Sequence, residues 1–95
     1  MVERSDVLRE LSQVIDPELG MAITELDLIE DVSVAKGKVS VKYHLTSNFC
    51  PPQFALAIAS DIKGRLTKLD GVDTVEQLLV GHFLADEVNG KINAN

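Results

Sequence analysis

Apolar residues near the start of the chain recur at the spacing of an amphipathic helix. They fall three, four or seven positions apart and so share one helical face: Val7, Leu8, Leu11, Val14 and Ile15. Ser5 is the candidate N-cap, because its hydroxyl can accept an unpaired N–H of the first turn. Pro17 disfavours helical geometry at Asp16. The pattern therefore predicts a helix that starts near Ser5 and stops at Asp16.

Two stretches rich in β-branched residues follow, at 28–35 and 38–46, with Lys36-Gly37 between them as a pair suited to a tight reversal. In the second stretch apolar residues alternate with polar ones, which assigns one strand face to the core: Val39, Val41, Tyr43 and Leu45. These features predict a β-hairpin.

A second helical pattern runs from Phe54 to Leu69, with Pro51 and Pro52 just before or at its first turn, where a missing N–H costs little. Asp70-Gly71 ends it. The stretch 72–81 predicts a third strand, which the intervening helix makes parallel to one hairpin strand through a right-handed crossover. The tail, 82–95, has a weak amphipathic pattern that predicts a short helix.

This order of elements predicts an α+β fold, a two-layer sandwich of order α-β-β-α-β with a short C-terminal helix and a three-stranded mixed sheet. A chain of 95 residues suits one domain, residues 1–95. Apolar residues form 45% of the chain and charged residues 25%, which is typical of a globular protein.

The charge balance and the lack of certain motifs exclude several functions. The net charge of −6 disfavours binding to nucleic acid. The sequence contains neither GxxxxGK[ST] nor GxGxxG, so we expect no nucleotide site. No apolar run is long enough to cross a membrane, and the start carries no secretory signal. Because a single cysteine cannot form an intrachain disulfide, a reducing cytoplasm is the expected location.

Cys50, the only cysteine, stands directly before two prolines at the predicted start of the second helix. A helix N-terminus offers unpaired N–H groups and the positive end of the helix dipole, and both favour thiolate over thiol. Cys50 is therefore a candidate nucleophile or soft-metal ligand. The alternative is a small buried apolar residue, the commoner fate of a lone cysteine.

Polar residues in two places accompany this thiol. Thr46 and Ser47 offer hydroxyl groups that can cap the helix or hold a ligand. Asp16 and Glu18 place two carboxylates on one stiff turn, and the sequence leaves open whether that turn lies beside Cys50 or is a plain turn.

The two histidines, His44 and His82, match no zinc-site spacing with Cys50, so no zinc is expected.

Four segments together resemble the iron–sulfur cluster assembly domain of PaaD-like and SufT-like proteins, formerly a domain of unknown function. They are DPELG at 16–20, ITELDLIEDV at 23–32, LTSNFCPP at 45–52 and DGVDTV at 70–75. The resemblance implies an α/β fold and a role in the maturation of iron–sulfur proteins, not conventional catalysis. It also implies a functional site made of Asp16, Pro17, Glu18, Thr46, Ser47 and Cys50.

By the same resemblance, Cys50 is a transient ligand of an iron–sulfur cluster, and the partners are client apoproteins and a P-loop scaffold ATPase. Clusters usually need four ligands, so one cysteine per chain calls for others, from a homodimer, glutathione or a partner. The alternatives are an interaction adaptor in which Cys50 is structural and, less favoured, a thiol enzyme that uses Asp16 or Glu18 as acid or base.

The chain departs from the family pattern in two places. Asp27 stands where relatives usually have glycine, and the tail lacks tryptophan.

Overall fold

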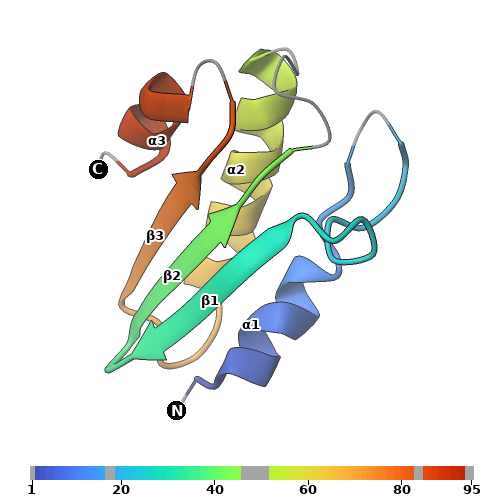
Figure 1. Ribbon diagram of the computed structural model, residues 1–95. Coiled ribbons are helices and arrows are strands. Elements are labelled where there is room, and N and C mark those ends of the chain that lie inside the picture. The colour runs from blue at the N-terminus through green and yellow to red at the C-terminus, as the bar shows by residue number, and fades with distance from the viewer. Residues whose placement is uncertain (1, 17–18, 46–51, 83–84, 94–95) are drawn as a thin grey trace.

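The structure, a computed structural model, describes residues 2–16, 19–45, 52–82 and 85–93 (Figure 1). It contains three helices and three strands: α1 (Arg4–Leu11), β1 (Ile29–Ala35), β2 (Lys38–Tyr43), α2 (Pro52–Thr67), β3 (Thr74–Leu79) and α3 (Ala85–Asn93). The sheet order is β1-β2-β3, with β1 antiparallel and β3 parallel to β2. The predicted α+β fold with a mixed three-stranded sheet is confirmed.

α1 and α2 lie side by side over one face of the sheet, and α3 lies beside its β3 edge (Figure 1). The opposite face of the sheet carries no helix in the described part of the chain. Buried apolar side chains from all six elements form one cluster, which includes Val7, Val32, Val41, Ile62, Leu79 and Val88. The molecule therefore has one core between the helices and the sheet.

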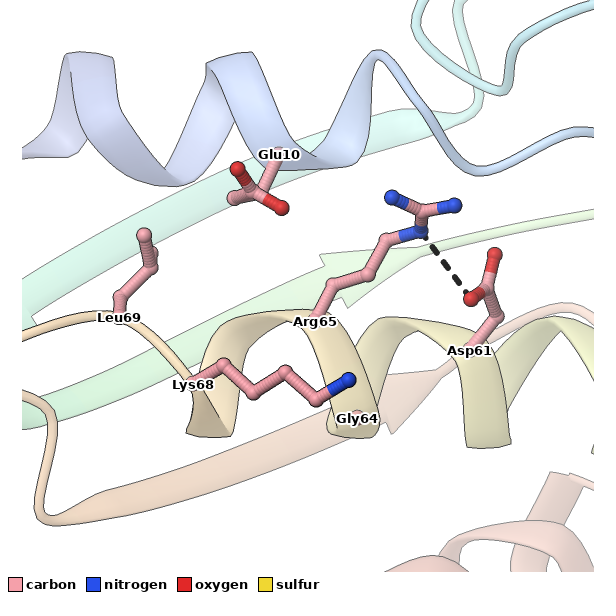
Figure 2. Close-up of a pocket in the computed structure, with 6 residues that line it drawn as sticks. All are labelled: Glu10, Asp61, Gly64, Arg65, Lys68 and Leu69. Carbon is pink, nitrogen blue, oxygen red and sulfur yellow. Dashed lines mark hydrogen bonds and ion pairs between the residues drawn. The ribbon is translucent and has the colours of Figure 1, made fainter.

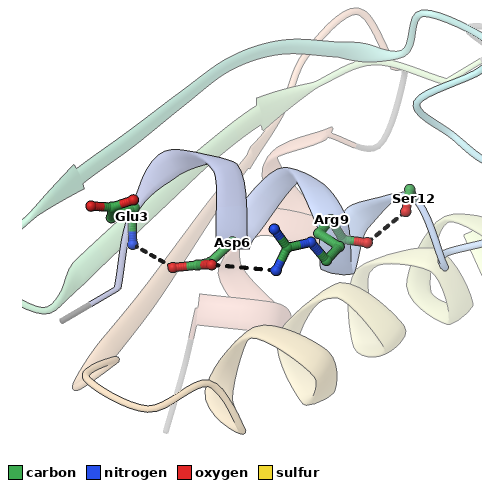
Figure 3. A network of polar contacts seen from close by, with 4 residues as sticks. All are labelled: Glu3, Asp6, Arg9 and Ser12. Atoms are coloured by element: carbon green, nitrogen blue, oxygen red, sulfur yellow. Dashed lines mark hydrogen bonds and ion pairs between the residues drawn. The ribbon is translucent and has the colours of Figure 1, made fainter.

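α1 is shorter than predicted and begins earlier. Its N-cap is Glu3, not Ser5, and the Asp6 carboxylate accepts the Glu3 N–H at 3.0 Å while it also pairs with Arg9 at 3.6 Å (Figure 3). At the other end the Ser12 hydroxyl donates to the Arg9 carbonyl at 2.5 Å, and the helix stops at Leu11. A short polar network thus fixes both ends of α1.

The residues beyond Leu11 form a ribbon in place of the expected last helical turn. The Ile23 N–H donates to the Val14 carbonyl at 2.9 Å, and Ile15 forms an antiparallel bridge with Ala22. β-branched residues such as Val14 and Ile15 have low helix propensity and suit an extended chain. The consequence is that Val14 is buried whereas Ile15, expected on the same buried face, is 48% exposed.

The hairpin forms as predicted. Lys36 and Gly37 both have positive φ, at 50° and 82°, which is typical of the two-residue turns that join twisted strands. The Gly37 carbonyl accepts N–H groups from Asp73 and Thr74, so the turn also holds the start of β3. The four predicted core residues of β2 and its continuation are all buried: Val39, Val41, Tyr43 and Leu45.

A buried polar contact links the sheet to α2. Gln77 on β3 donates to the Ala59 carbonyl of α2 at 2.9 Å and accepts from the Tyr43 hydroxyl at 3.3 Å. Burial raises the pKa of Tyr43 well above its ordinary value of about 10, because the phenolate would lose its hydration. The contact keeps both polar groups paired inside the core.

The observed strands are shorter than the predicted ones, because a sequence pattern locates the ends of an element less well than its middle. β2 ends at Tyr43, and Thr46, the predicted last residue, lies outside the described residues. β3 occupies 74–79 within the predicted 72–81. Its parallel pairing with β2 confirms the predicted crossover through α2. α3 confirms the predicted tail helix.

Candidate functional site

The residues that the sequence assigns to the site belong to two segments, 16–18 and 46–50. The structure describes Asp16, and the other members lie outside the described residues: Pro17, Glu18, Thr46, Ser47 and Cys50. Direct contact between the two segments therefore stays a prediction, and the site is built here from Asp16 and from the described residues around both segments.

The described neighbours of both segments lie at one end of the molecule (Figure 1). β2 and β3 are parallel and both end there, and α2 begins there because it runs back antiparallel to them. The segment from Ser12 to Leu28 enters the sheet at the same end, where the His44 N–H donates to the Leu28 carbonyl at 2.9 Å. We call this end the carboxyl end of the sheet.

Asp16 is 2% exposed and organises the loop that follows it. Its N–H donates to the Met21 carbonyl at 2.8 Å, and its carbonyl accepts the Gly20 N–H at 2.8 Å. Its carboxylate accepts the Leu19 N–H at 3.4 Å. Gly20 has a φ of 69°, as the predicted turn requires. Asp16 thus closes the turn with its main chain and its side chain.

Three apolar side chains stand exposed on this loop; the sequence pattern predicts burial for Ile15 and no role for Leu19 or Met21. Ile15, Leu19 and Met21 are 48%, 53% and 43% exposed, and with Leu78 they are the exposed large apolar residues of the described chain. The signal in the sequence is the apolar residues on both sides of the Asp-Pro-Glu turn. Exposed apolar groups in one place are typical of a contact surface.

The loop also belongs to a strongly acidic part of the chain. No lysine or arginine occurs from residue 10 to residue 35, whereas seven acidic residues do: Glu10, Asp16, Glu18, Glu25, Asp27, Glu30 and Asp31. The whole net negative charge of the chain therefore comes from this region, which favours approach of a positively charged partner.

Asp27, at the position where the family resemblance implies glycine, has a φ of 59°. This is the left-handed region, which glycine adopts freely and which aspartate tolerates better than most other residues. The substitution therefore preserves the backbone turn that leads into β1.

The two histidines lie near the carboxyl end of the sheet, one after β2 and the other after β3. The His44 Nδ1 is 3.0 Å from a Glu30 carboxylate oxygen, and both side chains are partly exposed. His82 is buried at 8% exposure, and its carbonyl accepts the Ala85 N–H at the start of α3. Among the residues that the structure describes, no group of three or more histidine, cysteine or acidic side chains is placed to hold a metal ion.

A pocket between α1 and α2 lies away from this end. Figure 2 shows Glu10 above it and Arg65 and Lys68 below, with Arg65 donating to Asp61 at 3.1 Å. Its lining comes from Glu10 of α1, from the later half of α2 and from the two residues that follow α2, whereas the candidate site lies where α2 begins. The pocket lining is an ordinary charged helix surface that contains none of the predicted site residues.

Comparison with known proteins identifies the family. Residues 4–77 match the family described as iron–sulfur cluster assembly protein. The chain belongs to this family, as the sequence resemblance implies. No helix within the described residues is long and apolar enough to cross a membrane.

Two relatives and one solved structure agree with this family match. The chain is 35% identical to the Fe-S protein maturation auxiliary factor YitW of Bacillus subtilis, over 81% of this chain and 74% of that protein. It is 38% identical to an iron-sulfur cluster carrier protein of Synechocystis, over 80% of this chain but only 21% of that longer protein. A crystal structure of a domain of unknown function, DUF59, from Bacillus anthracis superposes with a TM-score of 0.74 at 35% identity, covering 80% of this chain and 72% of that one.

Proposed function

We propose that this domain is an iron–sulfur cluster assembly factor that carries clusters or helps to deliver them to client apoproteins. Membership of the iron–sulfur cluster assembly family over residues 4–77 is the observation that carries the proposal. The names of the relatives, a maturation auxiliary factor and a cluster carrier, agree with it. The cluster is the cargo of the domain.

In this proposal Cys50 supplies a thiolate to the cluster or to a client. α2 begins at Pro52, so the thiol precedes the helix start by two residues, where the helix dipole favours the thiolate. Thiolate sulfur is the usual ligand of iron–sulfur clusters, which commonly take four such ligands. Since the chain has one cysteine, the remaining ligands come from a partner, a second copy or glutathione.

Thr46, Ser47 and the Asp16-Pro17-Glu18 turn shape the surroundings of the thiol. The convergence of the described neighbours of both segments at the carboxyl end of the sheet supports this arrangement. Asp16 acts as a positioning residue, because its buried carboxylate is engaged with the turn. The partners in this proposal are client apoproteins and a P-loop scaffold ATPase, in the cytoplasm.

Anaerobic reconstitution with iron and sulfide tests the cysteine role. Wild type should bind iron and develop the visible absorbance of a cluster. Cys50→Ser should bind little iron and develop little of this absorbance. Ser60→Ala, an exposed change on α2, is the matched control and should behave as wild type. Full delivery of cluster to an apo-ferredoxin by Cys50→Ser would contradict a ligand role for the thiol.

An adaptor without a cluster of its own is the second candidate, and the exposed residues Ile15, Leu19 and Met21 favour it. An adaptor docks partners through this loop, so Leu19→Lys should lower maturation of a reporter iron–sulfur enzyme in cells while Cys50→Ser leaves it unchanged. The reverse pattern would exclude the adaptor and support the thiolate role. Thr67→Lys, an exposed change at the far end of α2, serves as the control.

A further inference from the structure

α3 covers the outer edge of β3 in an unusual way. β3 is the last strand of the sheet, so alternate residues point their N–H and C=O groups away from β2. Asn93 accepts the Gln77 N–H at 2.9 Å and donates to the Gln77 carbonyl at 2.7 Å. Asn89 does the same with Leu79, at 2.7 Å and 3.0 Å. Four hydrogen bonds thus fill the places that another strand would occupy.

The two asparagines fit the two strand residues because the rise of the helix between them nearly equals the rise of the strand. Four residues of a helix rise about 6 Å, and two residues of a strand rise about 6.6 Å, so Asn89 and Asn93 can reach Gln77 and Leu79 together. A carboxamide offers one acceptor and a donor side by side, as a peptide of a neighbouring strand does. The sequence signal is an apolar residue followed by asparagine, repeated four positions later in VNGKIN.

Besides these bonds, the described contacts that hold α3 to the domain are a short apolar face and a hydrogen bond from α2. Val88 and Ile92 are its buried residues, and Lys63 of α2 donates to the Ile92 carbonyl at 2.7 Å. The helix has nine residues and contains Gly90, and a helix this short is marginal without such contacts. The family match ends at Gln77, before α3 begins. The covering of the edge is therefore a property of the part of this chain that the family match leaves out.

We propose that α3 is a displaceable cap on the β3 edge, and that the uncapped edge pairs antiparallel with β3 of a second copy of this chain. A two-fold axis at Leu78 sets Gln77 opposite Leu79 of the other copy, so the groups now bonded to Asn89 and Asn93 bond to each other. The two Leu78 side chains, each 48% exposed in the monomer, then face one another, and Glu76 meets Val80 instead of a like charge.

Such pairing has a consequence for the candidate site. Antiparallel β3 strands put the carboxyl ends of the two sheets at opposite ends of a six-stranded sheet, so the two sites do not share a cluster. The cap thus holds the chain as a monomer. The edge through which two copies would associate is distinct from the candidate site. This inference does not rest on the proposed function.

The test removes the asparagine bonds and leaves the helix. Asn89→Ala with Asn93→Ala keeps helix propensity and the buried Val88 and Ile92. Sedimentation equilibrium should give wild type near its monomer mass of 10.4 kDa and the double variant near twice that mass. Glu87→Ala with Lys91→Ala, exposed changes on the same helix, is the matched control and should stay monomeric. Adding Leu78→Lys to the double variant should restore the monomer.

Amide hydrogen exchange gives a second readout that does not depend on the double variant. Gly90→Ala should slow exchange at Gln77 and Leu79 about threefold, because alanine favours the helix and no heavy atom lies within 4 Å of the added Cβ. Unchanged exchange in Gly90→Ala would overturn the cap. So would a folded double variant that stays monomeric, a dimer that survives Leu78→Lys, or a wild type that already dimerises through this edge.

Discussion

At the scale of single residues, Tyr43 shows how burial controls a titration. The chain has one tyrosine and no tryptophan, so the near-ultraviolet absorbance of tyrosinate reports on Tyr43 alone. Burial raises its pKa in the folded state, and the unfolded chain ionises near pH 10. Above that pH the unfolded state binds fewer protons than the folded state, and the free energy of unfolding therefore falls as the pH rises.

We expect Tyr43 to resist ionisation in the folded protein and to ionise together with unfolding in alkali. Tyr43→Phe should cost about 1 kcal/mol at neutral pH through the lost hydrogen bond to Gln77. The same variant should lose less stability than wild type between about pH 10 and pH 12. Urea unfolding at several pH values measures both effects. Tyrosinate that appears near pH 10 while the protein stays folded would show the burial to be wrong.

Asp27 provides a second test at this scale. Its φ of 59° favours glycine, so Asp27→Gly should leave the free energy of unfolding equal or higher, whereas Asp27→Ala should lower it by about 1 kcal/mol. Ser33, exposed within β1, is the matched position, and there alanine should be more stable than glycine. Urea denaturation measures which variant, glycine or alanine, is more stable at each position. The same ranking at both positions would show that the positive φ of Asp27 does not control its stability.

At the scale of elements, the glycines show which backbone positions need glycine and which only tolerate it. Gly64 lies in α2 with no heavy atom within 4 Å of an added Cβ, so Gly64→Ala should raise the free energy of unfolding by about 0.5–1 kcal/mol. Gly37 has a φ of 82°, and its added Cβ would stand 2.5 Å from a carboxylate oxygen of Asp73. Gly37→Ala should lower the free energy of unfolding by more than about 1 kcal/mol.

Thermal and urea denaturation of these two variants distinguish a helix effect from a general effect of alanine. If both variants gained stability, the positive φ at the hairpin turn would be wrong. If both lost stability, α2 would need flexibility or close approach at Gly64.

At the scale of the whole molecule, the single core predicts one cooperative transition. Every helix and strand contributes to the same buried cluster, so apart from α3, the displaceable cap proposed above, none should unfold alone at a cost much below that of the whole. Far-ultraviolet circular dichroism and Tyr43 fluorescence should give coincident urea curves, and the calorimetric and van't Hoff enthalpies should agree. Two separated transitions would contradict a single domain over residues 1–95.

The sequence by itself determined the order of elements and much of the core. Alternation in 38–45 fixed which face of β2 is buried, because side chains in a strand point to opposite sides at every second residue. Lys36-Gly37 determined the hairpin, and the helix between β2 and β3 required a parallel crossover. The family, too, could be inferred from its motifs, which the match over 4–77 supports.

Only the tertiary structure decided where α1 ends, because the pairing of Val14 with Ile23 outweighs a helical pattern that continues to Ile15. It also decided that Asp16 is buried within a turn and that Asn89 and Asn93 bond the edge of β3. These features depend on contacts between residues distant along the chain or on different elements. Local spacing determines which face a residue occupies, whereas the partner on that face is set by the packing of the whole fold.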